Sequence, residues 1–137
     1  MSDLERAKAG LDGHSLCLVN EDTVITDDSR GIGGLFRITG ERDLAGFSCA
    51  DLIIGRAAAM LYIKASAAAV HGRVMSEGAA SLFGEHGIPC SWDTLTERII
   101  DRSGKDICPM DKAVADTGDP NEGRRLIGDT LEKLRRQ

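Results

Sequence analysis

Aromatic side chains are scarce in this sequence of 137 residues, which contains one Trp, one Tyr and three Phe. Proteins that bind single-stranded nucleic acids stack the bases on aromatic rings, so this composition does not favour such a role. The 17 Lys and Arg are also outnumbered by 22 Asp and Glu, and the net charge of -5 repels a phosphate backbone. We therefore expect no nucleic acid polymer as a partner.

A long apolar run is missing as well. The most apolar stretch, residues 52–70, is interrupted by Arg56 and Lys64 and is rich in Ala, which favours a buried helix over a membrane span. The first ten residues show no apolar segment after basic residues, as a secretory signal would. We predict no membrane association, a cytoplasmic location with reduced cysteines, and a single domain over residues 1–137.

The spacing that metal sites require is absent too. The four cysteines and three histidines are scattered along the chain, at Cys17, Cys49, Cys90, Cys108, His14, His71 and His86. Zinc hydrolases and deaminases combine a Cys-x-x-Cys pair or a His-x-Glu pattern with a proton-carrying glutamate. We therefore expect no metal and no other cofactor.

The residues that are present indicate alternating strands and helices. Ser2 with Glu5 predicts a capped helix that ends by Gly13, and residues 15–20 and 23–26 predict a hairpin. Asp51 is predicted to cap a central helix through the apolar residues that follow it. The remaining predictions are a strand at 68–75, a helix at 77–86, extended chain at 88–92, a helix or strand at 95–100, a helix at 111–116 and a terminal helix from Asp119. This order favours a right-handed crossover between parallel strands.

Glycine is abundant in the sequence, with 16 residues. Three of these glycines lie in the segment Ser29–Gly34. This segment lacks the lysine of a nucleotide-binding P-loop and a full dinucleotide fingerprint, so a simple connection between strand and helix is the alternative interpretation. Within it, Arg30 is the residue suited to bind an anion through its planar guanidinium.

Two predicted helix starts are further candidates for anion binding. Gly55 and Arg56 lie near the start of the central helix, and Ser76 and Glu77 begin the next one. Free N–H groups at such starts bind anions. The alternative is that Ser76 caps its own helix, that Glu77 complements the helix dipole, and that Arg56 has an internal partner.

Cys108 is a candidate nucleophile, because Lys105 and a helix start would lower the pKa of its thiol. The alternative is a structural Cys-Pro turn after a turn at residues 101–104. No histidine is close to Cys108 in sequence, so a Cys-His pair would have to be built by the fold.

Four blocks of the chain together resemble the family called domain of unknown function 1893, over nearly the whole length. The blocks are residues 29–32, residues 54–59, Ser76-Glu77 with residues 86–88, and residues 107–110. The resemblance implies an α/β fold like that of cytidine deaminases: a three-layer α/β/α sandwich around a mixed sheet of about four to five strands. It also places the deaminase zinc ligands near residues 55–57 and 76–79, where this sequence has neither Cys nor His.

Three hypotheses of function follow. The first is a protein that binds a small anionic or nucleotide-like ligand without zinc, through Arg30, Gly55, Arg56, Ser76, Glu77 and Cys108. The second is a metal-free or thiol-dependent enzyme on the same scaffold. The third is a homo-oligomeric interaction protein that packs its alanines at 57–59 and 67–69 against a second copy.

Overall fold

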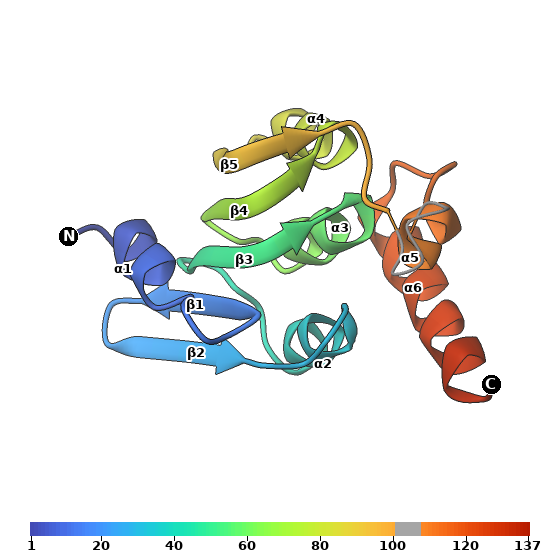
Figure 1. Ribbon diagram of the computed structural model, residues 1–137, viewed down its shortest axis with the longest axis horizontal. Coiled ribbons are helices and arrows are strands. Elements are labelled where there is room, and N and C mark those ends of the chain that lie inside the picture. The colour runs from blue at the N-terminus through green and yellow to red at the C-terminus, as the bar shows by residue number, and fades with distance from the viewer. Residues whose placement is uncertain (101–107) are drawn as a thin grey trace.

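The computed structural model describes residues 1–100 and 108–137, and this part of the chain forms an α/β fold (Figure 1). Its five strands are β1 (Leu16–Asn20), β2 (Thr23–Asp27), β3 (Ser48–Ile54), β4 (Ala69–Ser76) and β5 (Cys90–Thr96). Its six helices are α1 (Asp3–Ala9), α2 (Gly33–Glu41), α3 (Arg56–Lys64), α4 (Glu77–Glu85), α5 (Pro109–Ala113) and α6 (Pro120–Arg135). None of the helices in the described residues is long and apolar enough to cross a membrane.

The strands form one mixed sheet in the order β2-β1-β3-β4-β5. β1 is antiparallel to both β2 and β3, whereas β3, β4 and β5 run parallel to one another. The predicted hairpin is confirmed, with Glu21 at a positive φ of 53° in its turn. The predicted parallel crossover is confirmed as well, because α4 connects β4 to its parallel neighbour β5.

Helices cover the two faces of the sheet unequally. α1 packs on one face, against β1, β3 and β4, and it is the one helix on that face among the described residues. α3 and α4 lie on the opposite face, and α2 and α6 pack against α3 from outside (Figure 1). The predicted three-layer α/β/α arrangement with a mixed sheet is therefore confirmed.

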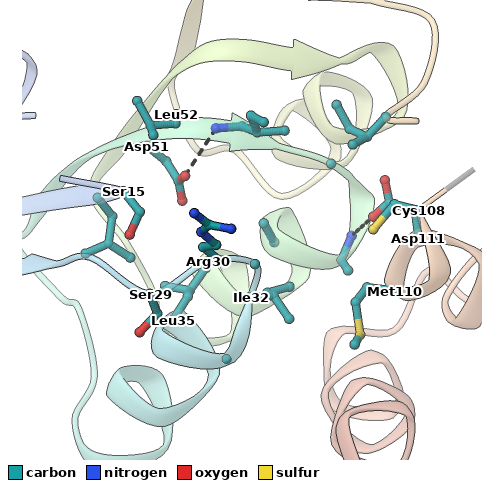
Figure 2. Close-up of a pocket in the computed structure, with 18 of the residues that line it drawn as sticks. Ser15, Ser29, Arg30, Ile32, Leu35, Asp51, Leu52, Cys108, Met110 and Asp111 are labelled. Atoms are coloured by element: carbon teal, nitrogen blue, oxygen red, sulfur yellow. Dashed lines mark hydrogen bonds between the residues drawn. The ribbon is translucent and has the colours of Figure 1, made fainter. Parts of the chain in front are cut away.

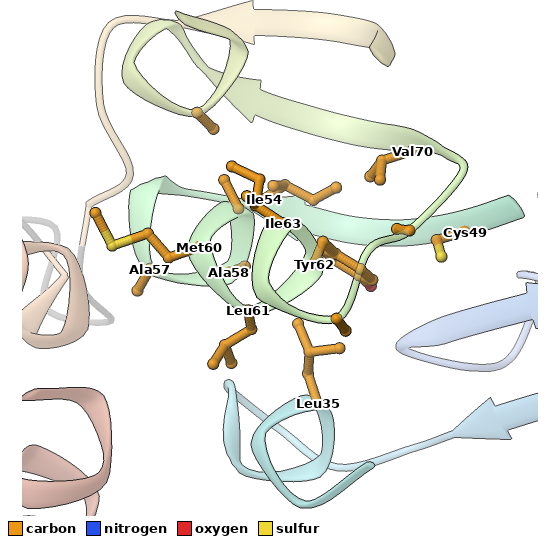
Figure 3. Close-up of a cluster of buried hydrophobic side chains, with 14 of the residues drawn as sticks. Leu35, Cys49, Ile54, Ala57, Ala58, Met60, Leu61, Tyr62, Ile63 and Val70 are labelled. Atoms are coloured by element: carbon orange, nitrogen blue, oxygen red, sulfur yellow. The ribbon is translucent and has the colours of Figure 1, made fainter. Parts of the chain in front are cut away.

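The main core surrounds α3, whose residues Ala57 to Ile63 are all buried. Leu61 points toward α2, from which Leu35 points back, while Tyr62 and Ile63 lie on the side of the sheet (Figure 3). Met60 reaches toward the C-terminal helices. A Cβ at Gly123 of α6 would overlap the sulfur of Met60, so glycine is what allows α6 to approach α3 this closely.

One predicted element is wrong. Asp51 does not cap a helix, because residues 48–54 form strand β3 and the helix begins only at Arg56. Adjacent β-branched residues at Ile53 and Ile54 fit a pleated strand, and β1 and β4 on either side supply the hydrogen-bond partners. The single apolar run from Leu52 thus contains a strand end, a glycine and a helix.

The other boundaries agree closely with the predictions. The capped helices at Ser2, Ser76 and Asp119 are confirmed, each with the predicted side chain accepting a backbone N–H. β5 continues through Leu95 to Thr96, and α5 begins at Pro109, two residues before the predicted start at Asp111. The turn predicted at residues 101–104 and Lys105 lie outside the described residues.

Candidate functional site

A cavity of about 1150 Å³ lies where β3 ends and β1 begins. Its walls come from the segment of residues 28–33, the start of α3, the start of α5 and the last turns of α6 (Figure 2). Residues from distant parts of the sequence therefore meet at one end of the sheet.

Most of the lining is apolar, and several of its side chains are unusually exposed. Ile53, Ile100 and Leu134 line the cavity and are 55%, 48% and 42% exposed. Exposed large apolar side chains that face one cavity typically mark a binding site, because a bound molecule removes them from water.

Arg30 contributes a cationic group to this apolar cavity. Its guanidinium points inward, toward the Asp51 carboxylate (Figure 2). Arg30 makes no hydrogen bond or ion pair with any of the described residues. Two other polar side chains of the cavity have partners: Arg73 donates to Asp12 at 2.5 Å, and His14 Nδ1 lies 2.5 Å from Asp28 Oδ1.

Asp51 lies opposite Arg30 and is half-buried. Its Oδ2 accepts a hydrogen bond from the Tyr62 hydroxyl at 2.7 Å, and its Oδ1 accepts the Ile53 N–H at 3.3 Å. Burial raises the pKa of Asp51 to about 6, although these hydrogen bonds act in the opposite direction. The cavity thus contains a carboxyl group that is easier to protonate than an exposed aspartate.

The side chain of Asp111, a residue of α5, caps the start of α3. Gly55, the N-cap residue, has no side chain to cap the helix, and Asp111 Oδ1 accepts the Ala57 N–H at 2.9 Å instead (Figure 2). A Cβ at Gly55 would overlap the Asp111 carboxylate. Burial raises the pKa of Asp111, while the N–H groups of Ala57 and Arg56 and the Arg56 charge lower it. An internal carboxylate therefore fills the place where the sequence suggested an external anion.

The cavity brings together three of the six predicted ligand-binding residues: Arg30, Gly55 and Cys108. Cys108 is half-buried and lies at the N-cap of α5, where its N–H donates to Ile99 O at 3.0 Å. Arg30, Gly55 and Cys108 come from three separate blocks of the sequence.

The other three predicted residues, Arg56, Ser76 and Glu77, are not among the described residues that line the cavity. Arg56 donates from Nε to Val114 O at 3.0 Å and from Nη2 to Thr117 O at 2.6 Å. Arg56 thereby connects the start of α3 to the chain after α5, which agrees with the alternative interpretation that this arginine has an internal partner.

Ser76 is buried and accepts the Ala79 N–H at 3.1 Å as the N-cap of its own helix. Glu77 is exposed in the first turn of the same helix. The Ser76 hydrogen bond and the position of Glu77 agree with the alternative interpretation of these residues.

The residues at the two helix starts do not fit a zinc ion. The positions around Gly55 and Ser76 contain no Cys or His, and the described residues contain no group of three His, Cys, Asp or Glu arranged to hold a metal. Asp111, a hard oxygen ligand, is already used to cap α3. These helix starts therefore lack the ligands with which a deaminase holds its zinc-activated water.

The alanines proposed for an oligomer interface are not all at the surface. Ala57, Ala58 and Ala59 are buried in the chain's own core, so they are not available to a second copy. Ala68 is exposed and Ala67 is buried. The homo-oligomer remains a prediction without this support.

Sequence reasoning missed the cavity carboxylates Asp51 and Asp111, because the local pattern assigns Asp51 to a helix cap and Asp111 to a helix. The signal that could have found Asp51 is its position two residues before a β-branched pair that ends at Gly55, since a polar residue near the carboxyl end of a strand often lies at a site. No local signal identifies Asp111, whose partner Ala57 is 54 positions away.

Comparison with known proteins places the chain in one family. The model of the Domain of unknown function (DUF1893) matches residues 8–131. The crystal structure of a DUF1893 family protein from Thermotoga maritima is similar, with a TM-score of 0.86 and 24% sequence identity over 94% of this chain and 90% of that chain. No curated protein matches the chain. Because the family model covers most of the sequence, the protein belongs to the DUF1893 family.

Proposed function

We propose that the protein binds a small organic anion of nucleotide-like build in the cavity at the end of β3. Arg30 takes the anionic group, and the apolar walls cover the rest of the molecule. The observation that carries the proposal is the guanidinium of Arg30, which points into an apolar cavity and has no partner among the described residues.

Charge and size support this proposal. Arg30 is exposed, so its guanidinium is accessible to a ligand from solvent. A guanidinium binds phosphate or carboxylate oxygens through two parallel hydrogen bonds. The volume of about 1150 Å³ slightly exceeds the 300 to about 1000 Å³ typical of small-molecule sites, so a nucleotide has room in it. A nucleotide combines a charged phosphate with a flat, largely apolar ring, which matches both parts of the cavity.

A thermal-shift titration tests the proposal. The probes are inorganic phosphate, guanosine monophosphate, adenosine monophosphate and the two nucleosides. We expect a monophosphate to raise the melting temperature of the wild type, since a ligand at about 100 times its Kd adds about 2.7 kcal/mol of stability. Arg30→Gln should bind about tenfold more weakly, because a charged hydrogen bond contributes about 1.5 to 3 kcal/mol.

The matched control is Arg37→Gln. Arg37 is exposed on α2, outside the cavity lining, and pairs with Asp27 and Glu41. We expect it to bind the monophosphates as the wild type does. Equal binding by Arg30→Gln and Arg37→Gln, or the absence of a shift with every probe, would overturn the proposal.

A second candidate, thiol-dependent chemistry in the same cavity, is favoured by the position of Cys108. Burial raises the pKa of the thiols of Cys17, Cys49 and Cys90, whereas Cys108 lines the cavity. Iodoacetamide labelling followed by mass spectrometry should then modify Cys108 much faster than Cys90, which is also half-buried. Similar rates at these two cysteines would exclude a reactive Cys108.

A further inference from the structure

We infer that Asp51 recognises the base of the ligand, and that this ligand is a nucleotide whose base presents two adjacent N–H donors, as guanine does. The inference deepens the proposed function and relies on it for the anionic end of the ligand. Sequence reasoning gave Asp51 no such role, and it becomes visible only because β3 ends in the cavity.

The Asp51 carboxylate is oriented but not saturated by the protein. An ionised carboxylate offers about four acceptor positions. The Tyr62 hydroxyl occupies one of them on Oδ2 at 2.7 Å, and the Ile53 N–H contacts Oδ1 at 3.3 Å, which is long for such a bond. The Leu52 N–H is a third partner, with the smallest effect of the three on the pKa of the carboxylate. Acceptor capacity therefore remains on a carboxylate that lines the cavity.

The surroundings of Asp51 favour the binding of hydrogen-bond donors by its free acceptor positions. The side chain is half-buried beside apolar walls, and its raised pKa of about 6 shows that the internal hydrogen bonds do not fully offset the loss of hydration. At neutral pH the group is mainly ionised. Two parallel N–H donors bind such a carboxylate in a bidentate manner and replace the lost water.

Arg30 points toward Asp51 within the cavity (Figure 2). The two side chains form no ion pair, and Arg30 is not among the groups that shift the pKa of Asp51. A ligand between them would meet a cation at one end and a carboxylate at the other. Ile53, which lines the cavity and lies on the same face of β3 as Asp51, supplies apolar contact for the ring.

Calorimetric titration of guanosine monophosphate and inosine monophosphate tests the inference. Inosine lacks the 2-amino group and so offers one N–H donor where guanine offers two. We expect the wild type to bind guanosine monophosphate about tenfold more tightly. Asp51→Asn should abolish this preference, because its amide presents N–H donors toward the base, while the exposed Asp116→Asn should retain it.

Equal affinity of the wild type for the two nucleotides would overturn the inference, and this comparison needs no variant to fold. An unchanged preference in Asp51→Asn would overturn it as well.

Guanosine without phosphate separates this inference from the proposed function. If Arg30→Gln weakens nucleotide binding and Asp51→Asn does not, the role of Asp51 is wrong and the anion site stands. If guanosine binds as tightly as its monophosphate, and through Asp51, the anion site is wrong and the role of Asp51 stands. The absence of binding by every probe overturns both.

Discussion

Asp111 and Ala57, 54 positions apart in sequence, are joined by a hydrogen bond of 2.9 Å from the Ala57 N–H to Asp111 Oδ1. The carboxylate of the short helix α5 thereby caps α3, the most buried helix of the fold. The same contact holds α5, and with it Cys108, at the edge of the cavity.

Removing this cap should destabilise the protein. We expect Asp111→Ala to lower the free energy of unfolding by about 1 kcal/mol, because an N-cap carboxylate satisfies an otherwise unpaired N–H and opposes the helix dipole. Urea denaturation measures the change. Asp116→Ala, at an exposed site just after α5, is the control and should remain within about 0.5 kcal/mol of the wild type. Equal loss in both variants would show that the cap contributes nothing.

Arg56 should matter for stability and not for ligand binding. Arg56→Ala leaves the carbonyls of Val114 and Thr117 without their donor, so we expect a loss of about 2 kcal/mol in urea denaturation. Binding of guanosine monophosphate to the folded variant should be unchanged. A stable Arg56→Ala protein that no longer binds the nucleotide would instead support the ligand-binding role predicted from the sequence.

Asp51 should make stability depend on pH. Its pKa of about 6 in the folded state exceeds the ordinary value of 3.8, so the folded chain binds this proton more tightly than the unfolded chain. The folded state therefore gains stability as the pH falls from about 6 to about 4 and loses it as the pH rises through the same range. The wild type minus Asp51→Asn difference in unfolding free energy should grow by up to about 3 kcal/mol as the pH falls over this range. Asp111 is present in both proteins, so its contribution cancels, and a difference independent of pH would contradict the prediction.

The packing of α3 against α2 should contribute strongly to the stability of the protein. Leu61→Ala removes a fully buried side chain that faces Leu35, and we expect it to cost about 2 to 5 kcal/mol. Leu95→Ala, on the edge strand β5 and 40% exposed, should cost less than about 0.5 kcal/mol. Thermal unfolding of the two variants compares these sites directly. A smaller loss at Leu61 than at Leu95 would show that the buried contact is not a principal source of stability.

The amino-acid sequence by itself determined the elements whose signals are local. Ser2, Ser76 and Asp119 cap helices through N–H groups two or three residues away, and the two residues between β1 and β2 make a hairpin turn. The four blocks of the sequence were also sufficient to identify the family. These features depend on neighbours along the chain or on residue identity alone, so they can be predicted without coordinates.

Only the tertiary structure decided what the apolar run after Asp51 becomes and which residues share the cavity. β3 is a strand because β1 and β4 pair with it on both sides, which outweighs the helical tendency of its neighbours. That pairing places Asp51 opposite Arg30, while the distant Asp111 takes the start of α3 and Arg56 binds carbonyls beyond α5. Contacts between residues this far apart are set by how the elements pack, and no local pattern encodes them.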